Sequence, residues 1–570
     1  MNRFALALLL LLLPAAGFAQ DARISSPHVL RAQPVAAHHG MVVAQEKIAA
    51  RIGADILKRG GNAVDAAVAT GFAMAVTYPR AGNIGGGGFM VIHLARENKD
   101  IALDYRETAP KAATPTMFLG PDGKPDPEKS RDSALGIGVP GTVAGLAAAL
   151  ERYGSGKFTL RDLLAPSIKL ARNGFVITDD IADTLPDARQ RFAPWLSSVK
   201  LLSHADGTPL REGDRLVQPD LADTLQAIAD HGVDGFYDGP VADKLAKGIQ
   251  AAGGIITRDD LKSYQPVWRE PVRGHYRGYD IVSMPLPSSG GTVLIETLNI
   301  LEGYNLHKMG AQTPASLHLL IEAMKRAYAD RARYLGDPAY SKAPLARLLS
   351  KDYAAQQRAD IDLDRSTPVK AAAMQPHEGT NTTHFSVADA QGNAVSNTYT
   401  LNFSYGVGLI AEGTGVLLNN ELDDFTAAPG ASNAYGLVGY EANLPGPGKR
   451  PLSSMTPTIV LKDGKPVLVT GSPGGSRIIS TTLQVIVNAL DYHMNIAQAV
   501  SLPRLHHQWM PDEVRIERGF SQRTLDALRS MGHTLTAPMG QTSANSIAAT
   551  DRGWLGAADP RTRGAEAAGY

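Results

Sequence analysis

The sequence predicts an α+β protein in which helices and strands are arranged in layers. Helical and strand patterns alternate along the whole chain, with no internal repeat and no low-complexity tract, which excludes all-α and all-β architectures. With 570 residues, 44% of them hydrophobic, the chain can bury one large core or two to three smaller ones. The 57 glycines and 36 prolines predict many tight turns between the elements.

The first segment predicts a targeting signal. Arg3 precedes an apolar run over residues 4–13, Pro14 ends this run, and small residues follow up to Ala19. This order is typical of a secretory signal peptide, and the run is shorter than the roughly 20 residues that span a bilayer. We expect residues 1–19 to be removed and the mature protein to be periplasmic or secreted, without a membrane anchor.

The next elements follow from hydrophobic periodicity. Predicted helices cover 44–77 with a turn at 59–62, 142–153, 220–231, 241–252, 314–334 and 478–492. A glycine run at 85–88 leads into a predicted strand at 89–94.

The last third of the chain begins with an abrupt change of pattern. Residues 366–381 are polar and contain proline, which predicts an exposed loop. A strand pattern starts at Thr382 and continues to residue 388, and residues 394–401 return as its hairpin partner. A second strand pair is predicted at 458–461 and 467–470.

Composition excludes several partners and cofactors. The 56 basic residues balance the 56 acidic ones, and no basic run occurs, so neither nucleic acid nor an anionic membrane is an expected partner. The absence of cysteine excludes disulfides, cysteine nucleophiles and thiolate metal sites. HExxH is absent, and the adjacent pairs at 38–39 and 506–507 cannot place both imidazoles on one face of a helix or strand. We expect no metal and no organic cofactor.

Two isolated matches to catalytic motifs are better explained by structure. Residues 197–200 match SxxK, but neither SDN nor KTG accompanies them. Residues 136–141 match GxGxxG, but Pro140 interrupts the motif and no acidic residue follows at the required spacing, so a turn before a helix is expected.

Eight further motifs occur together and in order. They are GNIGGGGFM at 82–90, DYRETAP at 104–110, GVPG at 138–141, TTHFSVAD at 382–389, TLN at 400–402, NNELDDF at 419–425, RPLSSM at 450–455 and GSPGGSRI at 471–478. Singly, each is more typical of an ordinary strand, turn or helix start. Jointly they closely resemble the γ-glutamyltranspeptidase family, from about residue 35 to the C-terminal Tyr570.

The resemblance implies a four-layer αββα sandwich of the N-terminal nucleophile hydrolase type, made from a precursor that cuts its own Asn381–Thr382 bond. Residues 20–381 would form the large subunit and residues 382–570 the small one, within a single αββα unit. The Thr382 hydroxyl would attack the preceding carbonyl, and water would hydrolyse the resulting ester.

The same resemblance makes the freed Thr382 the catalytic nucleophile. A threonine hydroxyl is weak and needs a base, and the new α-amine, with a reference pKa of about 7.7–8.0, lies on the same residue. Thr400 would hydrogen-bond the Thr382 hydroxyl. The backbone N–H groups of Gly474 and Gly475 would form the oxyanion hole, in which each donor contributes about 3 kcal/mol.

A γ-glutamyl group is a zwitterion, and the resemblance implies one site of each charge for it. Arg106, with the hydroxyls of Ser453 and Ser454, would bind its α-carboxylate. The α-ammonium group would be bound by Asn402, Glu421 and Asp424. Residues 429–439, which include Tyr435, resemble the loop that closes over the substrate in bacterial members.

The implied activity is cleavage of γ-glutamyl amides such as glutathione through a γ-glutamyl ester on Thr382. The group would pass to water or to an amino acid or peptide acceptor. Two alternatives remain: a cephalosporin (glutaryl) acylase of the same fold, and a periplasmic binding protein without activity. The retained Asp424 and 429–439 loop favour γ-glutamyl substrates over acyl-cephalosporins, and the intact Thr382, Gly474 and Gly475 argue against an inactive protein.

Overall fold

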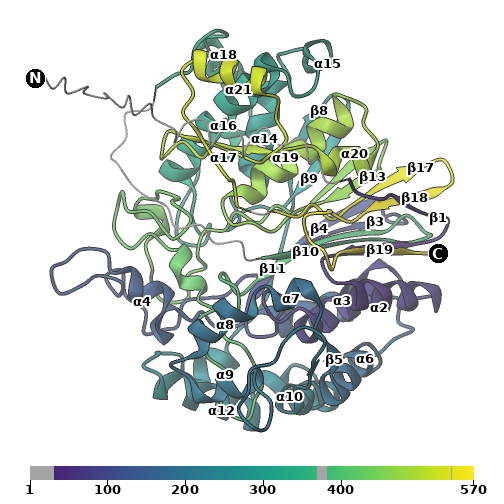
Figure 1. Ribbon diagram of the computed structural model, residues 1–570, viewed down its shortest axis with the longest axis vertical. Helices are drawn as coiled ribbons and strands as arrows, with labels where there is room; N and C mark the ends of the chain where they lie inside the picture. Colours follow the sequence, from purple (N-terminus) through teal and green to yellow (C-terminus); the bar gives the residue numbers. More distant parts are fainter. Residues whose placement is uncertain (1–30, 369–381, 541) are drawn as a thin grey trace, which may run out of the picture.

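Two seven-stranded sheets lie face to face between layers of helices (Figure 1). The computed structural model describes residues 31–368, 382–540 and 542–570, so the predicted signal peptide and Asn381 lie outside the described residues. The predicted αββα sandwich is confirmed.

The first sheet contains the hairpin that begins after Thr382. In order, its strands are β19 (Glu566–Gly569), β2 (Met41–Ala44), β10 (Thr383–Ala388), β11 (Ala394–Thr400), β3 (Gly87–Leu94), β4 (Lys99–Tyr105) and β7 (Val267–Arg269). All of its neighbouring strands are antiparallel, and β10 and β11 occupy its centre.

The second sheet covers the inner face of the first. In order, its strands are β1 (Val35–Ala37), β18 (Gly553–Ala557), β17 (Ser546–Thr550), β13 (Lys465–Thr470), β12 (Thr458–Lys462), β9 (Tyr279–Ser283) and β8 (Val272–Tyr276). Two small sheets lie outside the sandwich: β14 (Leu505–His506) with β15 (Val514–Ile516) and β16 (Leu535–Thr536), and β5 (Phe175–Val176) with β6 (Arg215–Leu216).

Helices cover both outer faces. Those on the side of the first sheet include α2 (Lys47–Lys58), α3 (Ala63–Thr77), α5 (Thr142–Tyr153), α6 (Leu160–Asn173), α10 (Pro219–His231) and α12 (Pro240–Ala251). Those on the side of the second sheet include α14 (Gly290–Leu301), α16 (Pro314–Tyr334), α18 (Lys351–Ala359), α19 (Arg477–Leu490), α20 (Ile496–Ser501) and α21 (Gln522–Ser530). None of the helices in the described ranges has both the length and the apolar composition that crossing a membrane requires.

Shorter helices complete the outer layers. They are α4 (Pro127–Arg131), α7 (Asp179–Ala182), α8 (Leu185–Phe192), α9 (Leu196–Leu201), α11 (Asp234–Tyr237), α13 (Arg258–Lys262), α15 (Leu306–Met309) and α17 (Leu345–Leu348).

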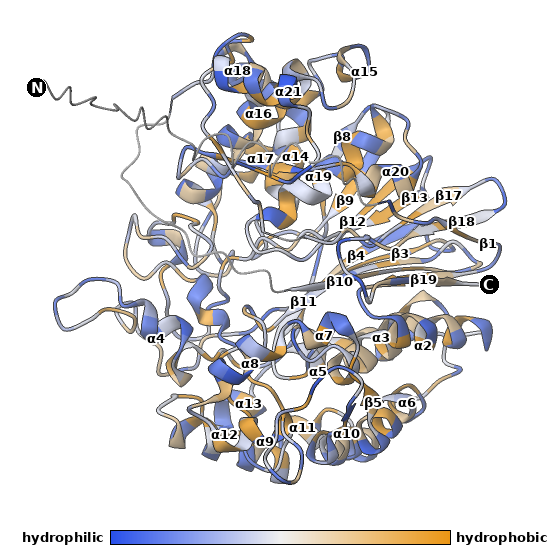
Figure 2. Ribbon diagram, in the orientation of Figure 1, coloured by the Kyte–Doolittle hydropathy of each residue, from blue (hydrophilic) through white to orange (hydrophobic). Residues whose placement is uncertain are grey.

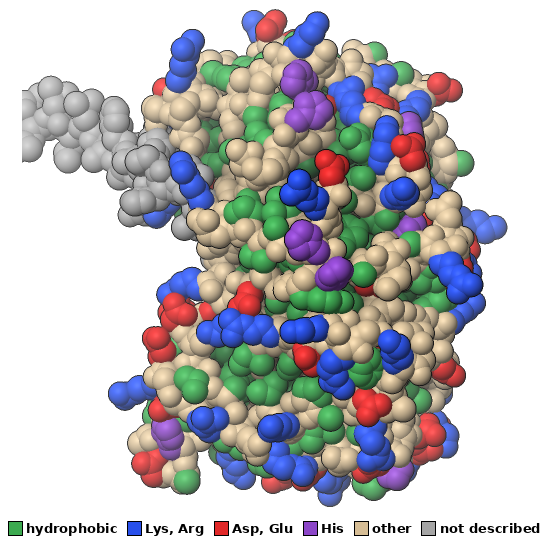
Figure 3. Space-filling model, turned by 90° about the vertical axis from the view of Figure 1, so that its right-hand side faces the viewer, with side chains coloured by type: hydrophobic (Ala, Val, Ile, Leu, Met, Phe, Trp, Pro, Cys, Tyr) green, Lys and Arg blue, Asp and Glu red, His purple; other side chains and the backbone are tan. Residues whose placement is uncertain are grey.

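Apolar side chains form one core between each sheet and its helices, and another between the two sheets. Figure 2 shows this distribution as hydrophobic ribbon along the strands and along the inner helix faces. On the face shown in Figure 3, basic and acidic side chains are interspersed, as the balanced composition predicts.

The predicted elements agree closely with the observed ones. Two predicted helices, 142–153 and 314–334, have the observed bounds, and the turn at 59–62 separates α2 from α3. The strand predicted from Thr382 starts one residue later, and the predicted hairpin pairs Thr383 with Tyr399. Helix α19 ends two residues before the predicted limit.

The glycine run at the start of β3 lets this segment approach the end of β11 closely. A Cβ at Gly86 would lie 2.0 Å from the carbonyl oxygen of Thr400, and one at Gly88 would lie 2.4 Å from the Tyr399 Cβ. Any larger residue would displace the end of β11. The run therefore fixes the position of Thr400.

Truncation of Phe89 should destabilise the fold strongly. Its ring is fully buried between the two sheets, and Phe89→Ala should cost about 3–5 kcal/mol because the cavity cannot be refilled by neighbouring strands. Chemical denaturation followed by circular dichroism measures this loss. Val176→Ala, at a side chain 49% exposed, is the control and should change stability by less than about 0.5 kcal/mol. Equal effects of the two substitutions would contradict the packing of the interlayer core.

Candidate active site

Thr382 lies at the end of the central hairpin, immediately before β10. Its side chain is buried, and its Oγ1 donates a hydrogen bond of 3.3 Å to Thr400 Oγ1. The same Thr400 oxygen accepts a hydrogen bond of 2.8 Å from the backbone N–H of Asn402. The two threonines predicted to act together are therefore in contact.

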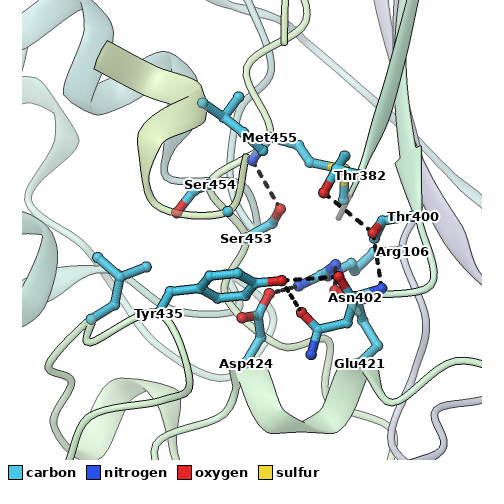
Figure 4. Close-up of a pocket in the computed structure, with 13 residues that line it drawn as sticks. Arg106, Thr382, Thr400, Asn402, Glu421, Asp424, Tyr435, Ser453, Ser454 and Met455 are labelled. Atoms are coloured by element: carbon cyan, nitrogen blue, oxygen red, sulfur yellow. Dashed lines mark hydrogen bonds and ion pairs between the residues drawn. The ribbon is translucent and has the colours of Figure 1, made fainter. Parts of the chain in front are cut away.

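A pocket brings the predicted site residues together (Figure 4). Its cavity volume is about 20 Å³, room for about one water molecule. Its lining comprises Arg106, Thr382, Thr400, Asn402, Glu421, Asp424, Tyr435, Leu437, Ser453, Ser454, Met455, Gly475 and Ile478. Of the predicted site residues that the structure describes, only Gly474 is outside this lining, and it directly precedes Gly475.

The two charged sites predicted for the substrate contact each other. Arg106 Nη1 forms an ion pair with Glu421, and Nη2 contacts Asp424 Oδ2 at 2.5 Å. The Arg106 Nε also donates to the carbonyl oxygen of Pro451 at 3.1 Å. All three charged groups are buried or nearly so, and the guanidinium joins the carboxylates into one cluster.

A third carboxyl group lies behind this cluster. Glu107 is fully buried, 3.8 Å from Arg106 Nη1, and its carboxyl oxygens have no hydrogen-bond partner among the described residues. Burial raises the pKa of Glu107 to about 7 and the pKa of Glu421 well above its usual value. One guanidinium thus faces three carboxyl groups, two of which hold a proton more readily than in water.

The 429–439 loop is tied to this cluster through adjacent aspartates. Asp424 Oδ1 accepts from Asn433 Nδ2 at 2.9 Å, and Asp423 Oδ2 accepts from the Ala434 N–H at 3.1 Å. Tyr435, which follows, donates to the carbonyl and side-chain oxygens of Asn402, both at 2.9 Å. The phenol therefore lies in the pocket lining, bonded to Asn402.

The glycine turn before α19 lies against Tyr435. Gly474 and Gly475 have φ values of +127° and +57°. A Cβ at Gly475 would come within 2.3 Å of the Tyr435 ring. Only glycine fits this turn, which precedes the positive N-terminal end of a 14-residue helix.

His384, two residues after Thr382, cannot act as its base. Burial lowers the pKa of His384 to about 3, so the imidazole is neutral. Its Nδ1 is bonded to Thr398 Oγ1 at 2.8 Å, and its Nε2 to Ser386 Oγ at 3.0 Å. Both ring nitrogens are engaged in the sheet.

Sequence reasoning missed one cluster of metal-ligand type, His318, Glu322 and His533, far from Thr382 in the sequence. His318 and Glu322 are one turn apart on α16, a spacing that can be read from the sequence, but His533 joins them only through the fold. The Glu322 carboxylate already forms ion pairs with Lys325 and Arg326, at 3.1 and 2.8 Å. Because these cations neutralise it, the cluster is satisfied without a metal ion.

Other residues of the site were also missed. Leu437, Met455 and Ile478 give the pocket its apolar wall, and Arg331 donates to Ser454 Oγ at 3.4 Å. Arg331 lies within a predicted helix, where a basic residue usually indicates a solvated face. Only the packing of α16 shows that it is buried.

Comparisons with known proteins agree with this geometry. The sequence model of the family described as "Gamma-glutamyltranspeptidase" matches residues 49–569. The "Glutathione hydrolase proenzyme" of Escherichia coli (strain K12) is 49% identical over 541 residues, which cover 94% of this chain and 93% of that protein.

Two solved structures are similar to the structure of this chain. A cephalosporin acylase from Bacillus halodurans has a TM-score of 0.83 at 28% identity, covering 96% of this chain and 98% of that chain. The γ-glutamyltranspeptidase of Helicobacter pylori has a TM-score of 0.55 at 48% identity, covering 56% of this chain and 91% of that chain. The match of the family over nearly the whole chain, with the pocket at Thr382, shows that this chain belongs to the γ-glutamyltranspeptidase family.

Proposed function

We propose that the chain is the precursor of a γ-glutamyl hydrolase and transferase that uses Thr382 as its nucleophile. The observation that carries this proposal is the pocket itself. It holds the Thr382 hydroxyl, a glycine turn and charged groups of both signs. These are the parts needed to bind a zwitterionic acyl group and to attack its far carbonyl.

Self-cleavage before Thr382 supplies both nucleophile and base. The E. coli relative is named a proenzyme, and Thr382 stands where a loop predicted from sequence meets β10. Cleavage there yields a large subunit of residues 20–381 and a small subunit of residues 382–570. Since both ring nitrogens of His384 are engaged, the new α-amine of Thr382 is the base that takes the hydroxyl proton.

In the catalytic cycle, the Thr382 oxygen attacks the γ-carbonyl of the donor and the amine leaves with a proton. Thr400 Oγ1, which accepts from the Thr382 hydroxyl in the present geometry, orients it for attack. The N–H groups of Gly474 and Gly475 stabilise the tetrahedral oxyanion. Water or an acceptor amine then attacks the ester and restores Thr382.

The charge cluster indicates which charges the donor substrate must carry. A bound γ-glutamyl group places its α-carboxylate on Arg106 and its α-ammonium on Glu421 and Asp424. The ion pairs between Arg106 and the two carboxylates are then replaced by ion pairs with the substrate, and the net charge of the site does not change. Asn402 accepts from the ammonium group as well, and the hydroxyls of Ser453 and Ser454 donate to the carboxylate. γ-Glutamyl amides such as glutathione carry both charges.

The alternative activity, glutaryl acylase, fits this cluster less well. A glutaryl group carries the carboxylate but no ammonium, so it would draw Arg106 away from Glu421 and Asp424 and leave buried carboxylates unpaired. Such a loss costs several kcal/mol. The structural likeness to a cephalosporin acylase therefore supports the shared fold and leaves γ-glutamyl donors as the preferred substrates.

The place of action is outside the cytoplasm. The pattern of residues 1–19 supports export through a cleaved signal peptide to the periplasm or the medium. Acceptors at that location are free amino acids and peptides.

Loss of the Thr382 hydroxyl should abolish both self-cleavage and turnover. Thr382→Ala should remain one full-length chain on a denaturing gel and release no p-nitroaniline from γ-glutamyl-p-nitroanilide, because no atom remains to attack. Thr382→Ser should process and retain activity. The matched control is Thr383→Val, since the buried Thr383 hydroxyl has no hydrogen-bond partner among the described residues. A Thr382→Ala protein that is still cut between residues 381 and 382 would exclude the mechanism.

Neutralising Asp424 should reverse the preference between donors. Asp424→Asn removes one buried partner of the substrate ammonium and should lower kcat/KM for γ-glutamyl-p-nitroanilide by about 10²–10³-fold. The release of p-nitroaniline from glutaryl-p-nitroanilide should stay the same or rise, because binding of this donor no longer leaves the Asp424 carboxylate without a partner. Asp122→Asn, at an exposed side chain, is the control. Equal losses on both substrates would contradict the assignment of Asp424 to the ammonium group.

A further inference from the structure

A second guanidinium, that of Arg331, lies behind Ser453 and Ser454 of the pocket lining. Arg331, on α16, is 4% exposed, and its Nη2 donates to Ser454 Oγ at 3.4 Å. Its Nε donates to Ser289 Oγ at 2.9 Å. Burial lowers the pKa of Arg331 to about 10, so the group remains charged at neutral pH.

The surroundings of Arg331 differ from those of Arg106. Arg106 contacts two carboxylates directly, whereas the described residues place no carboxylate within 4.0 Å of Arg331. Asp424 acts on it through space, but that carboxylate is already paired with Arg106. A buried cation without a direct counter-ion is costly unless a ligand supplies the negative charge.

Two serine hydroxyls of the pocket keep their hydrogens to donate to an anion, and one of them accepts a hydrogen bond from Arg331. Ser454 Oγ accepts from Arg331, so its single hydrogen is directed to another acceptor. Ser453 Oγ accepts from the Met455 N–H at 3.0 Å and likewise keeps its hydrogen to donate. Both residues line the pocket on the side opposite Glu421 and Asp424 (Figure 4).

Arg331 also fixes the backbone of this segment. Ser289, which accepts from Arg331 Nε, donates to the Ser453 carbonyl from its hydroxyl at 2.6 Å and from its backbone N–H at 2.8 Å. The guanidinium is thus joined to Ser453 through Ser289 and to Ser454 directly. Displacing it would release the Ser454 hydroxyl and remove the support of the Ser453 backbone.

We propose that Arg331 is a positioning residue for the α-carboxylate of the donor: it holds Ser453 and Ser454 as donors and supplies the positive charge behind them. This inference rests on the proposed function and adds a determinant of specificity to it. Arg106 and Arg331 then face the carboxylate from two sides. While Arg106 is ion-paired with Glu421 and Asp424, the charge of Arg331 still attracts the α-carboxylate of the incoming donor.

The test compares two donors that differ only in the α-carboxylate, γ-glutamyl-p-nitroanilide and 4-aminobutyryl-p-nitroanilide. Arg331→Gln should raise KM for the first about 10- to 100-fold, the effect of losing a charge-assisted hydrogen bond, with kcat within about threefold. The second donor should be nearly unaffected, so the ratio of the two kcat/KM values falls by the same factor. Arg331→Lys, which keeps the charge, should recover part of the ratio.

Arg333→Gln is the matched control, because Arg333 lies on the same helix but is exposed, with its guanidinium over the Trp509 ring. It should leave the ratio within twofold of the unsubstituted enzyme. Processing of each variant is checked on a denaturing gel before kinetics.

The outcomes separate this inference from the proposed function. If the unsubstituted enzyme does not hydrolyse γ-glutamyl-p-nitroanilide, the proposed function is wrong. If it does, and Arg331→Gln lowers kcat/KM for both donors equally, Arg331 only supports the fold and the inference is overturned. If Arg331→Gln is not cleaved before Thr382, the Ser289→Ala variant is measured instead. Ser289→Ala should lower the ratio of the two kcat/KM values about 3- to 10-fold, the effect of one lost hydrogen bond. An unchanged ratio overturns the inference.

Discussion

The pairing of β10 with β11 in the middle of the first sheet is the constraint on which the site depends. Thr383 is opposite Tyr399, so Thr382 and Thr400 come next to each other where the hairpin leaves the sheet. Strand β3 holds β11 from the other side, through glycines that admit no side chain. Because the sheet fixes this end, a hydroxyl on a chain terminus can be held as firmly as one in the interior of a strand.

Charge balance is the second organising feature. The pocket buries more ionisable groups than a stable interior tolerates unless each is paired or shares a proton, and Arg106 alone faces Glu107, Glu421 and Asp424. A zwitterion can enter such a site without changing its net charge, whereas an ion of one sign cannot. In the proposed function, selectivity for an α-amino acid head group follows from this electrostatic requirement as much as from the shape of the cavity.

Sequence alone could predict the sandwich, the central hairpin and nearly all of the pocket lining, because the motif residues at 104–110, 400–402, 419–425 and 450–455 converge where the resemblance implies. It could not predict the contact between the two charged sites, since this depends on how the 3₁₀ turn at Glu421–Asp424 meets the end of β4. Nor could it identify Arg331 or His533, whose burial follows from packing between helices distant in sequence. A short motif identifies residues that are close in the sequence, whereas only the fold identifies residues that are distant in the sequence and close in space.

The neighbouring aspartates of the 421–424 turn join the 429–439 loop to the charge cluster. Asp423 accepts from Ser130 Oγ at 2.6 Å and from the Ala434 N–H, which ties the loop to α4. Asp424 binds Arg106 and Asn433, which ties the same loop to the charge cluster. Asn433 also holds Tyr435, whose N–H donates to Asn433 Oδ1 at 3.0 Å. The cluster that binds Arg106 and the Tyr435 phenol in the pocket lining therefore belong to one hydrogen-bonded network.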